Sequence, residues 1–378
     1  MAEALGIGIV GCGNISAAYF RLAPLFRGLE VRACADISPA AAAARAAEFG
    51  VRAESVDALL ADPGVDVVIN LTIPAAHFGV TKAALEAGKH VYSEKPFVLA
   101  AEDGLALKAL ADANGLQVGS APDTFLGGAH QLARKLIDDG ALGTITAGTA
   151  FVLSHGMEMW HPNPGFFFLA GGGPMLDLGP YYIADLVNLI GPVRRVAAMT
   201  GAATPTRLVT AEGPAKGREI PVETPTTVQA LLEFANGAQV MVGASWDVWS
   251  HRHRQPIELY GTEGTLFVPD PNWFGGTVEI AGRDGVVRKE TWDHPLGVAN
   301  DVRPQASFAN YRSAGLADMA LAILEGREAR CGLDRALHGI EVMTSILQSG
   351  ETGRFVELKT TCTRPEPLDP AAARALLA

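Results

Sequence analysis

The stretch Gly8-Ile-Val-Gly11-Cys-Gly13-Asn-Ile-Ser16 decides the fold of the first part of the chain. It closes the apolar run Leu5–Val10 and opens a segment with helical spacing, so it predicts a strand that turns directly into a helix. Gly11 permits the tight turn, and Gly13 lets the backbone approach a pyrophosphate, which the free N–H groups of the helix attract. Ser16 replaces the usual third glycine but is still small enough for helix–strand packing. The stretch therefore predicts a dinucleotide-binding turn.

Asp36 supplies the second half of the predicted cofactor site. It ends the next apolar run, where its carboxylate can accept hydrogen bonds from both ribose hydroxyls of NAD. A 2′-phosphate would meet like charge there, and we expect Arg45 to lie too far along the following helix to compensate. The sequence thus favours NAD over NADP. The predicted cofactor-binding residues are Gly11, Gly13, Asn14, Ile15, Asp36, Thr72, Pro74, His77, Glu94 and Lys95.

The first third of the chain alternates short apolar runs with alanine-rich stretches of helical spacing. This alternation predicts a doubly wound α/β domain with a parallel sheet, over residues 1–122. The predicted strands are Leu5–Val10, Val31–Ala35, Val65–Leu71, His90–Tyr92 and Leu116–Val118, and the predicted helices are Ile15–Phe26, Pro39–Phe49, Ala75–Ala87 and Ala101–Asn114.

The pattern changes after about Pro122. Strands with period-two alternation and short turns predict a large, mostly antiparallel open sheet in an α+β domain over residues 123–378. We interpret the proline-rich segment 204–225 as a surface loop. The predicted strands are Thr144–Leu153, Val193–Thr200, Thr227–Phe234, Ala238–Trp246, Ile257–Tyr260, Thr265–Val268 and Gly276–Ala281, and the predicted helices are Leu126–Asp138, Pro174–Ile190, Phe308–Leu324 and Asp334–Ser349.

Two motifs carry candidate reactive groups. Glu94-Lys95-Pro96 follows the strand ending at Tyr92, and ligands of open α/β sheets bind beyond the carboxyl ends of strands. A lysine there can bond a substrate hydroxyl and exchange a proton with it. In the second motif, which begins at the three glycines 171–173, Asp177 and Tyr181 are four residues apart and are expected to share one helical face. A carboxylate beside a phenol can polarise a sugar hydroxyl.

An aromatic cluster with imidazoles precedes the three glycines. Trp160 can stack on the C–H face of a carbohydrate, while His155 and His161 can bind its hydroxyls. His161 is also a candidate base. Further along, His251-Arg-His-Arg254 has strand spacing and can form a solvated edge or a basic rim for an anionic group.

Composition limits the class of protein. The 378 residues are 48% hydrophobic and 19% charged, with a net charge of -11, which argues against binding nucleic acid or anionic membranes. No targeting segment or long apolar run is evident, and the four cysteines have no CxxC spacing, so we expect a cytoplasmic protein with free thiols. No set of residues has metal-ligand spacing, and no metal is predicted.

Taken in order, these motifs resemble those of the Gfo/Idh/MocA family of oxidoreductases. The resemblance covers nearly the whole chain and includes Ile257-Glu-Leu-Tyr-Gly-Thr-Glu-Gly-Thr265. It implies NAD(P)-dependent hydride transfer on polyhydroxylated substrates, and dimers or tetramers formed through the open sheet. By the same resemblance, Lys95 is the catalytic lysine and Asp177 is a substrate-binding or catalytic residue.

The chain also departs from the family pattern. Tyr181 stands where relatives carry an acid/base histidine, so either Tyr181 with Lys95 moves the proton or another base such as His161 does. Asp123 stands where relatives place Asn or Arg near the nicotinamide, which makes it a candidate substrate contact. The predicted catalytic residues are Lys95, Asp177, Tyr181 and His161, and the predicted substrate-binding residues are Lys95, Asp123, His155, Trp160, His161, Asp177 and Tyr181.

The predicted function is NAD-dependent oxidation or reduction of a sugar, cyclitol or sugar derivative. The alternative is an NAD-dependent glycoside hydrolase, which oxidises the sugar transiently, eliminates the glycoside, adds water and returns the hydride. A third possibility is an NAD-sensing regulator without turnover. Net formation of NADH separates the first from the second.

Overall fold

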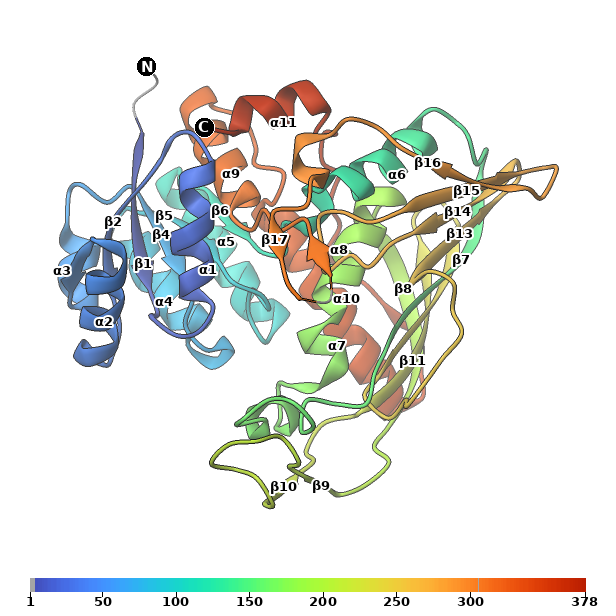
Figure 1. Cartoon of the computed structure of the whole chain (residues 1–378), viewed down its shortest axis with the longest axis horizontal. Coiled ribbons are helices and arrows are strands. Elements are labelled where there is room, and N and C mark those ends of the chain that lie inside the picture. Colours follow the sequence, from blue (N-terminus) through green and yellow to red (C-terminus); the bar gives the residue numbers. More distant parts are fainter. Residues whose placement is uncertain (1–3, 305) are drawn as a thin grey trace.

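The computed structural model describes residues 4–304 and 306–378. Its first part contains a six-stranded sheet in the order β3-β2-β1-β4-β5-β6, in which every neighbouring pair is parallel. This doubly wound arrangement confirms the predicted dinucleotide-binding fold, drawn in blue to cyan in Figure 1. The strands are β1 (Leu5–Val10), β2 (Leu29–Ala35), β3 (Arg52–Glu54), β4 (Val67–Asn70), β5 (His90–Ser93) and β6 (Val118–Ser120).

Local signals delimit the helices of this part. Ser38 accepts a hydrogen bond from the Ala41 N–H before α2, Pro39 occupies the first turn, and Gly50 ends the helix with φ of 72°. The short elements β3 and α3 were not predicted. The helices are α1 (Ser16–Leu22), the 3-10 turn η1 (Ala23–Leu25), α2 (Pro39–Phe49), α3 (Val56–Ala61), α4 (Pro74–Glu86) and α5 (Ala101–Asn114).

The second part is built on a nine-stranded sheet in the order β16-β15-β14-β13-β7-β12-β11-β8-β19. Its pairs are antiparallel except for β12 and β7, which confirms the predicted, mostly antiparallel sheet. The division at residue 122 stays a prediction. The strands are β7 (Ile145–Leu153), β8 (Val193–Gly201), β11 (Thr227–Phe234), β12 (Gln239–Ser245), β13 (Ile257–Gly261), β14 (Gly264–Val268), β15 (Val278–Gly282), β16 (Val287–Glu290) and β19 (Val356–Glu357).

Helices lie between the two sheets. Figure 1 shows α8 and α10 on the face of the large sheet that is turned toward the first part of the chain. The predicted helix Pro174–Ile190 is wrong in its continuity, because the chain breaks at Leu178 into two helices. The helices are α6 (Gly128–Asp138), α7 (Gly173–Asp177), α8 (Gly179–Leu189), α9 (Ala314–Glu325) and α10 (Leu333–Thr352).

Two further expectations need correction. Segment 204–225 is not a plain surface loop, since β9 (Thr206–Leu208) pairs with β10 (Glu219–Pro221) and the Arg207 side chain is buried between Glu158 and Asp247. A buried arginine with carboxylate partners ties this hairpin to the body of the molecule. Residues 251–254 form no strand: their backbone is irregular, although the rings of His251 and His253 lie 5.5 Å apart.

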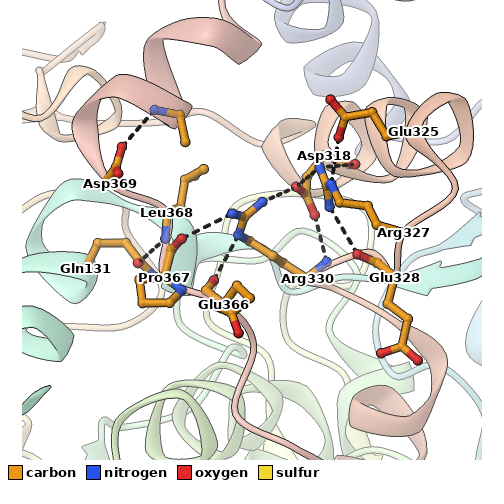
Figure 2. Close-up of polar contacts among 11 residues, drawn as sticks. Gln131, Asp318, Glu325, Arg327, Glu328, Arg330, Glu366, Pro367, Leu368 and Asp369 are labelled. Atoms are coloured by element: carbon orange, nitrogen blue, oxygen red, sulfur yellow. Dashed lines mark hydrogen bonds and ion pairs between the residues drawn. The ribbon is translucent and has the colours of Figure 1, made fainter.

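The C-terminal tail joins the two parts of the molecule. Figure 2 shows Arg330 between α9 and the tail, with Nη1 2.5 Å from the buried Asp318 carboxylate and with the Glu366 and Pro367 carbonyls as further acceptors. The tail continues into α11 (Pro370–Leu376), where the Leu376 carbonyl accepts from the Arg27 N–H. The last helix therefore packs against the first part of the chain.

Candidate active site

Lys95 lies beyond the carboxyl end of β5, at the edge where parallel α/β sheets bind ligands. The preceding Glu94 is anchored on both sides: its N–H donates to the Asn70 carbonyl, and its carboxylate accepts from the Tyr19 hydroxyl at 2.9 Å and from the Lys95 N–H at 2.8 Å. The Lys95–Pro96 bond is cis. These contacts fix the direction in which the lysine leaves the sheet.

Asp177, the last residue of α7, receives the lysine. Lys95 Nζ donates to Asp177 Oδ1 at 2.9 Å and to the Asp177 carbonyl at 2.8 Å. Burial by itself lowers the pKa of Lys95, but its interactions with Tyr181, Asp177 and Glu94 outweigh burial and raise that pKa above its usual value. The amine is therefore held as an ammonium in the protein alone.

Tyr181 joins the same centre. The Lys95 ammonium lies 5.3 Å from the centroid of its ring. The sequence prediction of one continuous helical face is wrong, because the helix breaks at Leu178. The lysine nevertheless meets both Asp177 and Tyr181, so the structure brings the three predicted residues together.

Sequence reasoning missed Arg312, which approaches Tyr181 from the segment before α9. Its guanidinium donates to Asn310 Oδ1 at 2.9 Å and to Asn272 Oδ1 at 2.9 Å. Burial lowers the pKa of Arg312, but its interactions with Tyr181 and Asp123 outweigh burial and raise that pKa above its usual value. The polar run 310–313 before an apolar helix was the available signal, but nothing in its spacing connected it to Tyr181.

Asp123 is buried beneath this segment. Its Oδ2 accepts from the Ser313 and Gly315 N–H groups, both at 3.0 Å, so it caps α9 from a distant part of the chain. Burial raises the pKa of Asp123 to about 6, against the lowering effect of the Gly315 N–H bond and of Arg312. Asp123 thus supports the loop that carries Arg312, and its contact with substrate stays a prediction.

The glycine turn suits a dinucleotide. Gly11 has φ of 103°, and a Cβ there would lie 2.6 Å from the Leu71 carbonyl, whereas a Cβ on Gly13 would meet nothing within 4 Å. Open space therefore faces Gly13, and Asn14 and Ile15, directly before α1, are exposed as well. These features fit a pyrophosphate.

Asp36 is oriented by two backbone donors: Cys12 N–H and Ser38 N–H each lie 2.8 Å from one carboxylate oxygen. Arg45 contacts the glycine turn. Its Nη2 donates to the Gly13 carbonyl at 3.2 Å and its Nε donates to Ser16 Oγ at 3.1 Å. These contacts do not test whether Arg45 could reach a 2′-phosphate beside Asp36, so the expectation that it lies too far away stays a prediction.

The other predicted cofactor residues lie after β4. Thr72 and Pro74 are accessible at the start of α4. His77 is buried, with Nδ1 2.7 Å from the Pro96 carbonyl oxygen and Nε2 3.0 Å from that of Thr72. His77 therefore links the loops after β4 and β5, and a direct contact with the cofactor stays a prediction.

The aromatic cluster that precedes the three glycines has contacts of its own. Trp160 is 63% exposed, and His161 packs edge-on against Trp160 and accepts from the Asn163 N–H at 3.1 Å. His155 stacks on Trp249 at 3.4 Å between ring centroids. Within the described part of the chain, none of the three predicted side chains in this cluster hydrogen-bonds to the Lys95 centre. Their role in binding substrate stays a prediction.

No group of three or more His, Cys, Asp or Glu side chains in residues 4–304 and 306–378 is arranged to hold a metal ion. No helix in those ranges combines the length and apolar character needed to cross a membrane.

Family models match both parts of the chain. The model for the oxidoreductase family with an NAD-binding Rossmann fold matches residues 5–121, and the GFO/IDH/MocA C-terminal domain matches residues 130–267. The chain belongs to the GFO/IDH/MocA family of oxidoreductases, and its N-terminal part is an NAD-binding domain.

Two relatives of known activity are similar to this chain along about two thirds of its length. Levoglucosan dehydrogenase of Pseudarthrobacter phenanthrenivorans is 28% identical over 288 residues, which are 69% of this chain and 73% of the relative. The 1,5-anhydro-D-fructose reductase of Ensifer adhaerens is 32% identical over 271 residues, covering 68% and 74%. The solved levoglucosan dehydrogenase in complex with NADH has a TM-score of 0.80 at 22% identity, covering 95% of this chain and all of that one. This last likeness shows the fold.

Proposed function

We propose that the protein transfers a hydride between NAD and a hydroxyl-bearing carbon of a sugar, cyclitol or related derivative. The main support for this proposal is the hydrogen bond between Lys95 and Asp177, which lies beyond β5 of an NAD-binding sheet. Levoglucosan and 1,5-anhydrofructose, named by the relatives, are both cyclic polyhydroxylated compounds.

The roles of the side chains follow from their contacts. Bound NAD supplies reversible hydride transfer. Lys95 binds the reacting oxygen and exchanges its proton, and Asp177 orients Lys95 through the bond to Nζ. Tyr181, between Lys95 and Arg312, is the second proton-transfer group in place of the family histidine.

Lys95 as an ammonium is ready to donate a proton, which is the state that reduction of a carbonyl requires. Oxidation of a hydroxyl requires the neutral amine first. The structure therefore supports proton donation at neutral pH more directly than proton removal.

The uncovered face of the large sheet supports a homo-oligomer. Leu231 in β11 pairs directly with Met241 in β12, and both side chains are 44% exposed, while Met199 in β8 is 80% exposed. Burying such side chains against a second copy is favourable. Sedimentation at micromolar concentration tests this, and Leu231→Glu is expected to dissociate the oligomer.

The activity is tested by incubating the protein with NAD and a panel of sugars, cyclitols and methyl glycosides in D₂O, followed by mass spectrometry. A product lighter by two hydrogens, formed in proportion to NADH, supports the proposal. A cleaved glycoside carrying ring deuterium without accumulated NADH would instead establish the hydrolase. Absence of any turnover, with NAD bound, would favour the regulator.

A further inference from the structure

Arg312 lies at the edge of the parallel sheet from which the reactive lysine emerges. The Gly315 N–H donates to Asp123 Oδ2 at 3.0 Å, just after β6, and a Cβ on Gly315 would lie 2.5 Å from the Tyr92 hydroxyl oxygen in β5. The segment that carries Arg312 into α9 therefore crosses the carboxyl ends of β5 and β6. Lys95 leaves the sheet at the same edge, directly after β5.

Neutral groups hold the Arg312 guanidinium in place. Its Nη2 donates to the carbonyl oxygen and to Oδ1 of Asn272 at 3.1 and 2.9 Å, and its Nη1 donates to Asn310 Oδ1 at 2.9 Å. The next residue, Ser313, has φ of 98°, a left-handed conformation that is unfavourable for a residue with a side chain and is typical of functional sites. These acceptors are uncharged, so they orient the cation without neutralising it.

No carboxylate is paired with this cation. Among the described residues, Arg312 forms no ion pair within 4.0 Å, whereas Lys95 is paired with Asp177 at 2.9 Å. Asp123 and Glu94 raise the pKa of Arg312, but Asp123 is bonded to main-chain N–H groups of α9 and Glu94 to the Lys95 N–H. Of these two cations, Arg312 is the one without an anion of its own.

A ligand can reach the Arg312 guanidinium. The side chain is partly exposed, and its Nε donates to no residue in the described part of the chain. Nε is also not among the unpartnered polar atoms that are shut off from solvent. Tyr181 raises the pKa of Arg312, and its ring lies 5.3 Å from the Lys95 ammonium, so both cations act on the same phenol. Arg312 thus offers one free N–H and an unpaired charge beside the reactive centre.

We propose that the substrate is a sugar acid, whose carboxylate binds Arg312 while Lys95 binds the reacting oxygen. This inference rests on the proposed function and names the class of substrate within it. A neutral hydroxyl would accept the hydrogen bond but leave the charge of the guanidinium unpaired, whereas a carboxylate accepts the bond and neutralises the charge. A phosphate monoester carries further negative charge at neutral pH, for which the described part of this centre holds no second unpaired cation.

Matched neutral and acidic sugars test the proposal by turnover. The probes are D-glucose with D-glucuronate, D-galactose with D-galacturonate, and D-glucose 6-phosphate, each incubated with NAD and followed by NADH formation. For at least one pair, kcat/KM is expected to be roughly tenfold to a hundredfold higher for the acid, the value of one charge-assisted hydrogen bond. A preference for the neutral sugars or for the phosphate would overturn the proposal.

Variants assign the preference to Arg312. Arg312→Gln is expected to raise KM for the preferred acid roughly tenfold or more and to change KM for its neutral partner less than about threefold. Arg303→Gln is the matched control. Arg303 and Arg312 lie 5.2 and 5.6 Å from the centroid of the same Trp273 ring, but Arg303 is already paired with Asp301 at 2.8 Å. It should keep the preference, and an undiminished preference in Arg312→Gln would refute the assignment.

Binding without turnover separates this inference from the proposed activity. Calorimetric titration of the complex of the protein with NADH is expected to give a Kd roughly tenfold lower for a uronate than for its neutral partner, and Arg312→Gln should abolish the difference. Such a difference without hydride transfer to or from any probe would support the role of Arg312 and contradict the proposed activity. Turnover of neutral sugars with no binding of either acid would do the reverse. If Arg312→Gln does not fold, the comparison of acid and neutral sugar in the unmodified protein decides.

Discussion

The Lys95 amine contacts Asp177 twice, through the carboxylate at 2.9 Å and through the main-chain carbonyl at 2.8 Å. The two residues come from different parts of the chain. Lys95 follows β5 of the parallel sheet, and Asp177 is the last residue of α7. Two acceptors from one residue fix both the position and the charge of the amine. The centre therefore depends on how the two parts of the chain pack, and its chemistry can be probed from either side.

Removing the amine tests the central assignment. Lys95→Ala is expected to lower kcat at least a hundredfold while the Kd for NAD, measured by protein fluorescence, changes little. General acid–base groups contribute about 10²–10⁴-fold to rates. Lys82→Ala is the control, since Lys82 is exposed and pairs with Glu86 on α4. Near-normal turnover in Lys95→Ala would sink the assignment.

The direction of the reaction should depend on pH with opposite signs. Because the pKa of Lys95 is raised, oxidation is expected to accelerate as pH rises toward that pKa, and reduction to slow. Asp177→Asn removes one of the charges that raise it, so both profiles should move to lower pH. The measurement is the rate of each reaction as a function of pH, from about 6 to about 10, below and up to the ordinary pKa of a lysine. Profiles unchanged in Asp177→Asn would show that another group titrates.

The proton-transfer group that replaces histidine can be identified by paired variants. Tyr181→Phe keeps the ring beside Lys95 but removes the hydroxyl, and is expected to lower kcat roughly tenfold to a hundredfold. His161→Gln, in the aromatic cluster, should change kcat less than about threefold, because no hydrogen bond among the described residues connects it to Lys95. The reverse ranking would make His161 the acid/base.

Cofactor choice should depend on Asp36 and Arg45 together. Asp36→Ala removes the carboxylate that opposes a 2′-phosphate, while Arg45 already reaches the glycine turn through Gly13 and Ser16. The ratio of kcat/KM for NADP over NAD is expected to rise about tenfold to a hundredfold, the value of a charge-assisted hydrogen bond. Adding Arg45→Gln should remove most of that gain. If the double variant keeps it, Arg45 plays no part.

Asp123 should make stability depend on pH. Its pKa is raised from 3.8 in the unfolded chain to about 6 in the folded protein, so the folded state holds the proton more tightly. Stability from this group is present at low pH and declines as pH rises from about 4 through 6, by about 3 kcal/mol.

Asp123→Asn keeps an oxygen that can accept from Ser313 and Gly315 but cannot ionise. At pH 8 it is expected to be as stable as the parent or more stable, and the difference between the two in urea unfolding should shrink toward pH 4. The exposed Asp112→Asn is the control and should show no such trend. A large loss of stability in Asp123→Asn at pH 8 would contradict the assigned pKa.

Much of the fold could be predicted from local sequence patterns. The alternation of apolar runs and alanine-rich helices predicted the parallel sheet, because strands buried on both faces must be continuously apolar. It missed β3 and α3, whose few residues contain too little periodicity to detect. It also joined α7 and α8 into one helix, although Gly179-Pro180 directly after Leu178 is the kind of pair that ends one helix and opens the next.

The sequence by itself determined the class of cofactor and pointed to Lys95 as the candidate catalytic residue. It did so because Gly11, Gly13, Asp36 and Lys95 each lie at the end of a predicted strand. Only the tertiary structure decided which residues meet that lysine. Arg312 and Asp123 come together from distant segments, and Arg45 reaches back to the glycine turn along a flexible side chain. Such contacts depend on how the elements pack, and the spacing of residues along the sequence does not indicate which distant segments come together.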